Sequence, residues 1–282
     1  MAHENRLLVI AVIYNSYPET LHFVESIYRC FETKASVVLV DNSPEKPGPS
    51  FMDKIQSYDF INYHYPGKNA GYFHGAQYGL EHFLEKHHEY PEWIIVSNVD
   101  IIFETREFLK ILGFNEADPD LGVVAPAIVS KKWKTDLNPF LTGRIPLQKL
   151  RFLQAVYSNI IIHNGYVLLY WLKKILTMLV KSRLPSASET TGTSHDIYAP
   201  HGSCIIFNRR YFERGGTLKH ISFLFEEEIF VAETSIKLGL KVRYVPELQV
   251  LHDEHSSVKN FISHKINRLY KQSLKDIIAR YY

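Results

Sequence analysis

Short apolar runs alternate along the chain with longer stretches in which apolar residues recur every three or four positions. The short runs predict buried strands, and the wider spacing predicts amphipathic helices. The predicted strands are 7–13, 37–40, 61–64, 93–96, 122–126, 204–207 and 242–245. The predicted helices cover about 18–31, 72–86, 105–112, 167–181, 226–238 and 259–282, and a short helix is predicted through Tyr211 and Phe212. This alternation is typical of an α/β protein whose mostly parallel sheet is flanked by helices.

Polar residues directly follow three of the predicted strands. Tyr14 and Asn15 follow 7–13, Asp41 follows 37–40, and Asp100 follows the strand at 93–96. The carboxyl ends of parallel strands share one edge of a sheet, where ligands of such folds bind. A carboxylate there can hold a divalent cation that bridges to the phosphates of a nucleotide. The structural alternative is that the Asp and Asn side chains only cap turns.

Three glycines recur every fourth residue near the helix predicted at 72–86. Gly71, Gly75 and Gly79 fall on one helical face, which allows a close approach of either a substrate or the protein core. The segment lacks the Gly-x-Gly-x-x-Gly fingerprint, and the turn after the first strand has no glycine, so a Walker phosphate loop is excluded.

Three consecutive acidic residues follow an aromatic run at 223–225. Burial near apolar neighbours raises the pKa of a carboxyl group toward that of a useful general base, so Glu226, Glu227 and Glu228 are candidates for this role. A solvated acidic run is the structural alternative. Near the end of the predicted sheet, His252 and His255 are candidate metal ligands, although single histidines are often structural.

The composition is that of an ordinary globular protein, with 46% hydrophobic and 22% charged residues. Its 282 residues and lack of a linker predict one large domain, and the net charge of +2 argues against nucleic-acid binding. Cys30 and Cys204 lie far apart, which favours a reducing cytoplasm over a disulfide framework. The run at 7–13 is too short for a signal peptide, and no run reaches the roughly 20 apolar residues of a membrane span.

One segment, from 131 to 183, is strongly basic. It holds ten basic residues, namely Lys131, Lys132, Lys134, Arg144, Lys149, Arg151, Lys173, Lys174, Lys181 and Arg183, with Asp136 as its only acid. Within it, 167–181 predicts a helix with an apolar face and a cationic arc, and 259–282 predicts a second basic amphipathic helix. Such helices bind anionic membrane surfaces. Packing against the protein core is the alternative.

Eight short motifs, taken in order, resemble the family 2 inverting glycosyltransferases, which have the GT-A fold. Within that family the chain resembles the rhamnosyltransferase-like group of bacterial polysaccharide synthesis. The resemblance covers residues 7–258 apart from the basic insertion. The motifs are Val12–Asn15, Val40–Ser43, Asn69–Phe73, Asn98–Asp100, Gly202, Gly215–Gly216, Glu226–Glu228 and His252–Ser257.

The resemblance implies a role for each matching residue. The implied nucleotide-sugar contacts are Tyr14, Asn15, Asp41, Asn69, Gly71 and Asn98, with Asp41 on the pyrimidine ring and Asn69 and Gly71 near the base and ribose. Asp100 would bind Mg²⁺ or Mn²⁺ on the diphosphate, with His252 as a second ligand. Glu227 would be the catalytic base, with Glu226 as the next candidate and Glu228 within the same register.

The resemblance also implies an activity and a location. The enzyme would move a sugar, rhamnose among the candidates, from a UDP- or dTDP-sugar to a hydroxyl of a glycan that is lipid-linked. It would act in the cytoplasm, peripherally on the inner face of the cell membrane. One catalytic domain would span 1–258, with a nucleotide-sugar half (1–130), the basic insertion (131–198) and an acceptor half (199–258), followed by the helix at 259–282.

Some positions depart from the family pattern. The usual Asp-x-Asp is Asn98-Val99-Asp100 here, Gln77 stands where asparagine is frequent, and Ile229 replaces a second acidic residue. These departures keep open a catalytically degenerate scaffold or binding protein with the same fold. A nucleotidyltransferase is the other alternative, although the loop from Tyr14 to Glu19 lacks the Gly-rich basic sequence that holds a triphosphate.

Overall fold

The computed structural model describes residues 6–105, 107–181, 192–254 and 262–282. The strands are β1 (Leu7–Ile13), β2 (Ala35–Asp41), β3 (Ile61–His64), β4 (Trp93–Ser97), β5 (Ile101–Phe103), β6 (Leu121–Ser130), β7 (His195–Ile197), β8 (Cys204–Asn208) and β9 (Lys241–His252). The helices are α1 (Tyr17–Phe31), α2 (Pro49–Gln56), α3 (Tyr72–His87), α4 (Phe108–Asn115), α5 (Leu147–Tyr157), α6 (Ile160–Lys181), α7 (Arg209–Glu213), α8 (Glu227–Lys237) and α9 (His264–Tyr281).

The strands form one nine-stranded sheet in the order β3-β2-β1-β4-β8-β6-β9-β5, with β7 paired to β9. The strands β1, β2, β3, β4, β6 and β9 run in one direction, while β5, β7 and β8 run against it. The predicted α/β fold with a mostly parallel sheet is therefore confirmed. All of the predicted strands are present, and the structure adds β5, β7, α2 and α5, which were not predicted.

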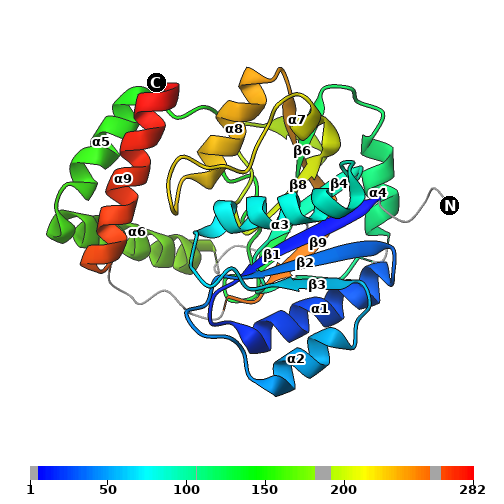
Figure 1. Ribbon diagram of the computed structural model, residues 1–282. Helices are drawn as coiled ribbons and strands as arrows, with labels where there is room; N and C mark the ends of the chain where they lie inside the picture. Colours follow the sequence, from blue (N-terminus) through cyan, green and yellow to red (C-terminus); the bar gives the residue numbers. More distant parts are fainter. Residues whose placement is uncertain (1–5, 106, 182–191, 255–261) are drawn as a thin grey trace.

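Helices cover both faces of the sheet, with α1 and α2 on one side and α3 and α8 on the other (Figure 1). Along β1, the side chains of Leu8 and Ile10 enter the core under α3 and α8, while Leu7, Val9 and Ala11 enter the core under α1. Because alternate side chains of the strand meet a covered face on each side, the whole strand is apolar.

The helical glycines pack against the sheet. A Cβ atom at Gly79 would lie 2.9 Å from Val40 and 3.0 Å from Val38, and one at Gly75 would lie 3.0 Å from Asn42. These contacts favour the core-packing alternative for both glycines.

The basic insertion and the C-terminal tail form one helical unit. Helices α5, α6 and α9 lie together at the left of Figure 1, beside α8. The inner face of α9 is buried through Ser273, Leu274 and Ile277. The amphipathic helix expected in the tail is confirmed over 264–281, but its apolar face packs on the protein. The helix expected from 167 begins earlier, at Ile160.

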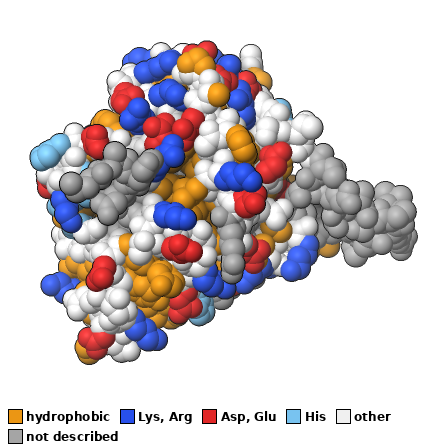
Figure 2. Space-filling model, turned by 90° about the vertical axis from the view of Figure 1, so that its right-hand side faces the viewer, with side chains coloured by type: hydrophobic (Ala, Val, Ile, Leu, Met, Phe, Trp, Pro, Cys, Tyr) orange, Lys and Arg blue, Asp and Glu red, His pale blue; other side chains and the backbone are white. Residues whose placement is uncertain are grey.

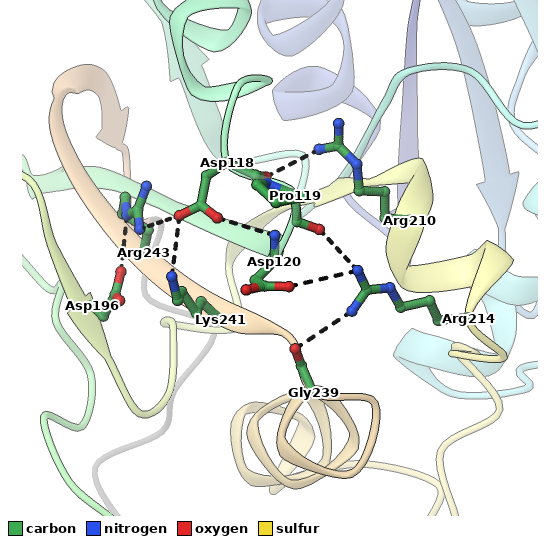
Figure 3. Close-up of polar contacts among 9 residues, drawn as sticks. All are labelled: Asp118, Pro119, Asp120, Asp196, Arg210, Arg214, Gly239, Lys241 and Arg243. Atoms are coloured by element: carbon green, nitrogen blue, oxygen red, sulfur yellow. Dashed lines mark hydrogen bonds and ion pairs between the residues drawn. The ribbon is translucent and has the colours of Figure 1, made fainter.

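Side chains of opposite charge are interspersed over the face of the molecule in Figure 2. A paired network of such charges lies at the amino ends of β6 and β9, where Asp118 binds two cations (Figure 3). Its carboxylate accepts from Arg243 at 2.7 Å, from Lys241 at 3.4 Å and from the backbone N–H of Asp120 at 3.0 Å. Arg214 donates to the carbonyl of Pro119 at 2.9 Å in the same loop. The network joins α7, β9 and the loop before β6, at the strand ends that carry none of the predicted ligand residues.

Replacing Asp118 by alanine is expected to lower the free energy of unfolding by about 1–2 kcal/mol at pH 7, since the carboxylate is largely shielded and bound to charged donors. The Asp120 N–H and the Arg243 guanidinium lower the pKa of Asp118. The contribution of Asp118 to the free energy of unfolding is therefore fully present above the ordinary carboxyl pKa of about 3.9. It is lost as the pH falls through the lower pKa that Asp118 has in the folded state. Urea denaturation at pH 7 and pH 3 measures this, with the exposed Asp53→Ala as control. If Asp118→Ala lowered the free energy of unfolding equally at both pH values, the prediction would be contradicted.

Candidate active site at the carboxyl edge of the sheet

An open pocket lies where β1 and β4 end side by side. Its lining is Val12, Tyr14, Ser16, Glu19, Asn98, Val99 and Asp100. The two strand-end motifs of Tyr14 and Asp100 thus meet at one edge, as parallel neighbours must. Ser16 and Glu19 were not predicted, because in the sequence they only mark the start of α1.

The loops after β1 and β2 are joined by polar contacts. Asn15 has a left-handed backbone (φ 55°), and its N–H donates to the hydroxyl of Ser43 at 2.8 Å. Asp41 is fully buried, and its two carboxylate oxygens accept from the Ser43 N–H at 2.9 Å and from the Tyr63 hydroxyl at 2.6 Å. Asp41 therefore fixes this turn, which is the structural alternative considered for it. Its contact with a pyrimidine stays a prediction.

The loop before α3 is anchored on two sides. The Asn69 side chain accepts from the Gly71 N–H at 2.9 Å, and the Gly71 carbonyl accepts from the Asn42 side chain at 2.9 Å. Gly71 has φ +90°, and a Cβ atom there would lie 2.0 Å from the Phe223 carbonyl oxygen. Only glycine suits this position, because it permits both the conformation and the contact. Asn42 positions the loop, a role that its place in the second strand-end motif did not reveal.

Asp100, which lines the pocket, forms a pair with His252. Asp100 Oδ2 lies 3.2 Å from His252 Nε2, because the antiparallel pairing of β5 with β9 sets Ile101 opposite His252. Burial lowers the pKa of His252, but the hydrogen bond and charge of Asp100 outweigh it, so the pKa is raised overall. Glu254 lies 3.8 Å from the other ring nitrogen. His255, the other candidate histidine, lies outside the described residues.

The donor set of this pair fits a divalent cation. Asp100 Oδ1 is buried and has no hydrogen-bond partner among the described residues, so one carboxylate oxygen is left to bind a ligand. A carboxylate oxygen beside an imidazole nitrogen suits Mn²⁺ or Mg²⁺. The described part of the chain has no cluster of three or more acidic, histidine or cysteine ligands. A cation here would thus need further ligands from a bound phosphate and water.

The acidic run at 226–228 is largely buried rather than solvated. The Glu227 side chain accepts from the Phe225 N–H at 3.0 Å, and that of Glu228 accepts from the Gly202 N–H at 3.2 Å. Burial and the charge of Glu228 raise the pKa of Glu227 to about 8 and that of Glu226 to about 7. Carboxyl groups with such pKa values can exchange protons near neutral pH.

Tyr72 lies near both the Asp100–His252 pair and the acidic run at 226–228. Its hydroxyl donates to the Gly202 carbonyl at 3.1 Å. Burial raises its pKa well above the ordinary value, and the charges of Glu227 and Asp100 add to the effect, so both carboxylates act on one phenol. Because the Gly202 N–H donates to Glu228 and the neighbouring His201 ring faces His252, the pair and the acidic run lie on either side of the segment 201–202. Tyr72 belongs to a matched motif, but the sequence did not mark it as the link.

His201 is a further side chain that was not predicted. Its ring faces that of His252 with centroids 6.2 Å apart, and the backbone N–H of His201 donates to the Asn138 side chain at 2.8 Å. Burial, together with the nearby His252, lowers the pKa of His201 to about 4 despite the charge of Asp100. The imidazole is therefore neutral at physiological pH.

Comparison with known proteins gives matches among structures alone. The sequence matches none of the protein families and none of the curated proteins with which it was compared. The mannosyltransferase PcManGT from Pyrobaculum calidifontis, in complex with GDP-Man and Mn²⁺, matches 95% of this chain and 61% of that chain, at 16% identity and a TM-score of 0.53. GalNAc-T7 with UDP, GalNAc and Mn²⁺ matches 96% of this chain and 48% of that chain, at 12% identity and a TM-score of 0.61.

A third structure, S. aureus TarS 1-349, matches 88% of this chain and 60% of that chain, at 10% identity and a TM-score of 0.53. The chain thus spans between 48% and 61% of the length of these three proteins. At such low identities the likeness concerns the fold. The sheet order and these matches show that the chain has the GT-A fold.

Proposed function

We propose that the protein is an inverting glycosyltransferase, which moves a sugar from a nucleoside-diphosphate sugar to a hydroxyl group of a glycan. One observation carries the proposal: the segment 201–202 joins the Asp100–His252 pair to the acidic run, because the His201 ring faces His252 and the Gly202 N–H donates to Glu228. Such a site offers a cation position for the leaving diphosphate and a base for the attacking hydroxyl. The fold, shared with proteins whose structures hold GDP-Man or UDP with Mn²⁺, supports this choice.

The nucleotide half of the donor is assigned to the pocket between β1 and β4. Tyr14, which is 52% exposed, and Asn98 offer an aromatic ring and an amide to a bound nucleotide. Asn15 and Asp41 hold the adjoining turn, and the Asn69–Gly71 loop closes the side toward the base and ribose. UDP- and dTDP-sugars are the expected donors, with rhamnose among the candidate sugars.

Asp100 and His252 would hold Mg²⁺ or Mn²⁺ on the donor diphosphate. The cation, when bound, offsets the negative charge that develops on the leaving group. Glu254 lies 3.8 Å from the Nδ1 atom of His252 and adds negative charge beside the ring. The neutral His201 adds no positive charge that would compete with the cation.

Glu227 is proposed as the base that takes the proton from the acceptor hydroxyl. The acceptor oxygen attacks the anomeric carbon on the face opposite the diphosphate, the bond to the diphosphate oxygen breaks, and the configuration inverts. Burial keeps the proton affinity of Glu227 close to what this transfer requires. Glu226 is the second candidate. Glu227 and Glu228 each accept one backbone N–H, from Phe225 and from Gly202 respectively.

The insertion is proposed to bind an anionic membrane surface, where a lipid-linked glycan acceptor would be presented to the site. Ile162, Leu169 and Leu176 recur every seven residues on α6 and are 53%, 67% and 62% exposed. An exposed apolar stripe in a segment with ten basic residues and one acid suits an interface of apolar chains and anionic headgroups. We place the protein at the inner face of the cell membrane. Among the helices that the structure describes, none combines the length and the apolarity needed to cross a bilayer.

Vesicle flotation is expected to show binding to liposomes that contain phosphatidylglycerol. The variant with Leu169→Glu and Leu176→Glu is expected to bind at least about tenfold more weakly, because each leucine loses about 2 kcal/mol of apolar burial. The control is Phe114→Glu, which changes a 72% exposed residue of α4. If the α6 variant floated like the wild type, the stripe would not be the contact surface.

The activity is tested by incubating the full chain with UDP-, dTDP- and GDP-sugars in the presence of Mn²⁺ and following the release of nucleoside diphosphate. Release from at least one donor supports transfer, and release from none contradicts it. The second candidate function is a binding protein that retains the fold, which Asn98 and the two-ligand cation site favour. In that case UDP would bind in calorimetry while no donor would be turned over. A nucleotidyltransferase would release pyrophosphate instead.

A further inference from the structure

The turn in front of α8 has an unfavourable backbone conformation. Phe225 and Glu226 are consecutive residues with φ of 73° and 65°. Side chains other than glycine are disfavoured there because Cβ approaches the following carbonyl oxygen. Such a conformation persists only where the surrounding structure holds it.

Helix α9 supplies contacts that hold this turn. The hydroxyl of Ser273 donates to the Phe225 carbonyl at 2.6 Å, and Ser273 is fully buried. The Tyr270 ring stacks on the Phe225 ring with centroids 3.8 Å apart and planes 8° from parallel. Asp276 accepts from the Ser222 hydroxyl at 3.0 Å. The three α9 residues follow one another at intervals of three, so they lie along one face of the helix.

The same turn is linked to the candidate base. The N–H of Phe225 donates to the Glu227 carboxylate at 3.0 Å, while the carbonyl of Phe225 is held by Ser273. On the other side, the Phe223 carbonyl contacts Gly71 in the loop before α3. The turn is therefore fixed between α9 and the nucleotide side of the molecule, and its conformation sets the direction of the Glu227 side chain.

We propose that α9 is a positioning clamp of the active site, in which Ser273 and Tyr270 hold the left-handed turn at 225–226 and thereby aim the Glu227 carboxylate. The assignment rests on the proposed function for the role of Glu227. Ser273 and Tyr270 are positioning residues, since their contacts run through Phe225. The C-terminal helix is thus a part of the catalytic machinery and not only a surface for membranes or core packing.

Hydrogen exchange measured by mass spectrometry on the full chain tests the clamp without any substrate. In Ser273→Ala and Tyr270→Leu, amides of 222–228 are expected to exchange at least about tenfold faster, while those of β1 and β4 keep their wild-type rates. Tyr270→Phe keeps the stacked ring, and Lys271→Ala changes an exposed residue of the same helix, so both should match the wild type. Unchanged exchange at 222–228, or an equal rise over the whole sheet, overturns the proposal.

Kinetics with the donor identified by nucleoside diphosphate release provide the second readout. Ser273→Ala is expected to lower kcat about 10- to 100-fold with the donor KM unchanged, because proton transfer depends on the position of the base. The pH at which kcat rises should also move down, since a loosened Glu227 gains water. The groups that face Glu227 are Glu226 and Glu228 on its own turn, Tyr72 from α3 and Tyr270 from α9.

The two readouts separate the clamp from the proposed function. If no donor is turned over but exchange at 222–228 rises in Ser273→Ala, the clamp stands and sugar transfer fails. If transfer occurs and Ser273→Ala leaves exchange, kcat and the pH profile unchanged, the clamp fails and sugar transfer stands. A drop in both kcat and thermal stability with an unshifted pH profile indicates a merely structural helix and also overturns the clamp.

Discussion

Replacing Glu227 by glutamine is expected to lower kcat about 1,000-fold, the usual effect of losing a general base, while the affinity for nucleoside diphosphate stays unchanged. Glutamine keeps the size of the side chain but cannot accept the proton of the acceptor hydroxyl. Steady-state release of nucleoside diphosphate and calorimetry with UDP and Mn²⁺ measure the two quantities. Glu226→Gln is the matched control, with an expected loss below about tenfold. Full activity in Glu227→Gln would assign the base to Glu226 or Glu228.

The pKa of Glu227 gives this prediction a pH dependence. Because a base acts when deprotonated and burial raises the pKa of Glu227 to about 8, kcat should rise as pH increases through that value. The raised pKa also means that folding loses stability as pH increases from the ordinary carboxyl pKa through about 8. Glu227→Gln should therefore melt at a higher temperature than the wild type at pH 9. A lower melting temperature of the variant at pH 9 would argue against a buried carboxylate.

Asp100→Ala is expected to weaken Mn²⁺-dependent nucleotide binding by at least about 100-fold, since even the loss of an outer-shell contact costs 10- to 100-fold in metal affinity. The carboxylate supplies the buried oxygen that has no partner among the described residues. Calorimetry of UDP binding with and without Mn²⁺ measures the loss, and the electron paramagnetic resonance signal of Mn²⁺ reports the ion directly.

Two further variants make the Asp100 result specific. His252→Ala removes the second ligand, and a smaller loss, about tenfold, is expected because water can replace an imidazole. Asp53→Asn removes an exposed carboxylate of α2 and should leave binding at the wild-type level. If Asp100→Ala kept the full response to Mn²⁺, the cation would bind elsewhere and the assignment of the pair would fail.

Several features of the fold could be predicted from the sequence because they depend on neighbours along the chain. The apolar run at 7–13 indicates a strand covered on both faces, and six of its seven residues are buried in the structure, while Val12 is half-buried at the pocket. Since neighbouring parallel strands end at one edge, Tyr14 and Asp100 were expected together, and they line one pocket. Short strands such as β5 and β7 could not be predicted, because a periodic pattern of apolar residues cannot be recognised over only three residues.

Contacts between distant segments could not be predicted in the same way. The pairing of β5 with β9 brings His252 to Asp100. That pairing depends on the order of all the strands in the sheet, which the local sequence does not specify. The acidic run at 226–228 has the composition of a solvated loop, and only packing against α3 and α9 buries it and raises its pKa values. The left-handed turn at 225–226 has no local signal either, because neither residue is glycine.

The amphipathic pattern of the tail shows where local information ends. By itself the sequence determined that the tail at 259–282 contains a helix with an apolar face, that the strands are buried, and that polar residues gather at one sheet edge. Only the tertiary structure decided that this face packs beside α8 and that Ser273 contacts the turn before Glu227. The physical reason is that apolar periodicity requires burial but is the same whether lipid or protein covers the face, whereas the covering partner depends on contacts between segments far apart in the chain.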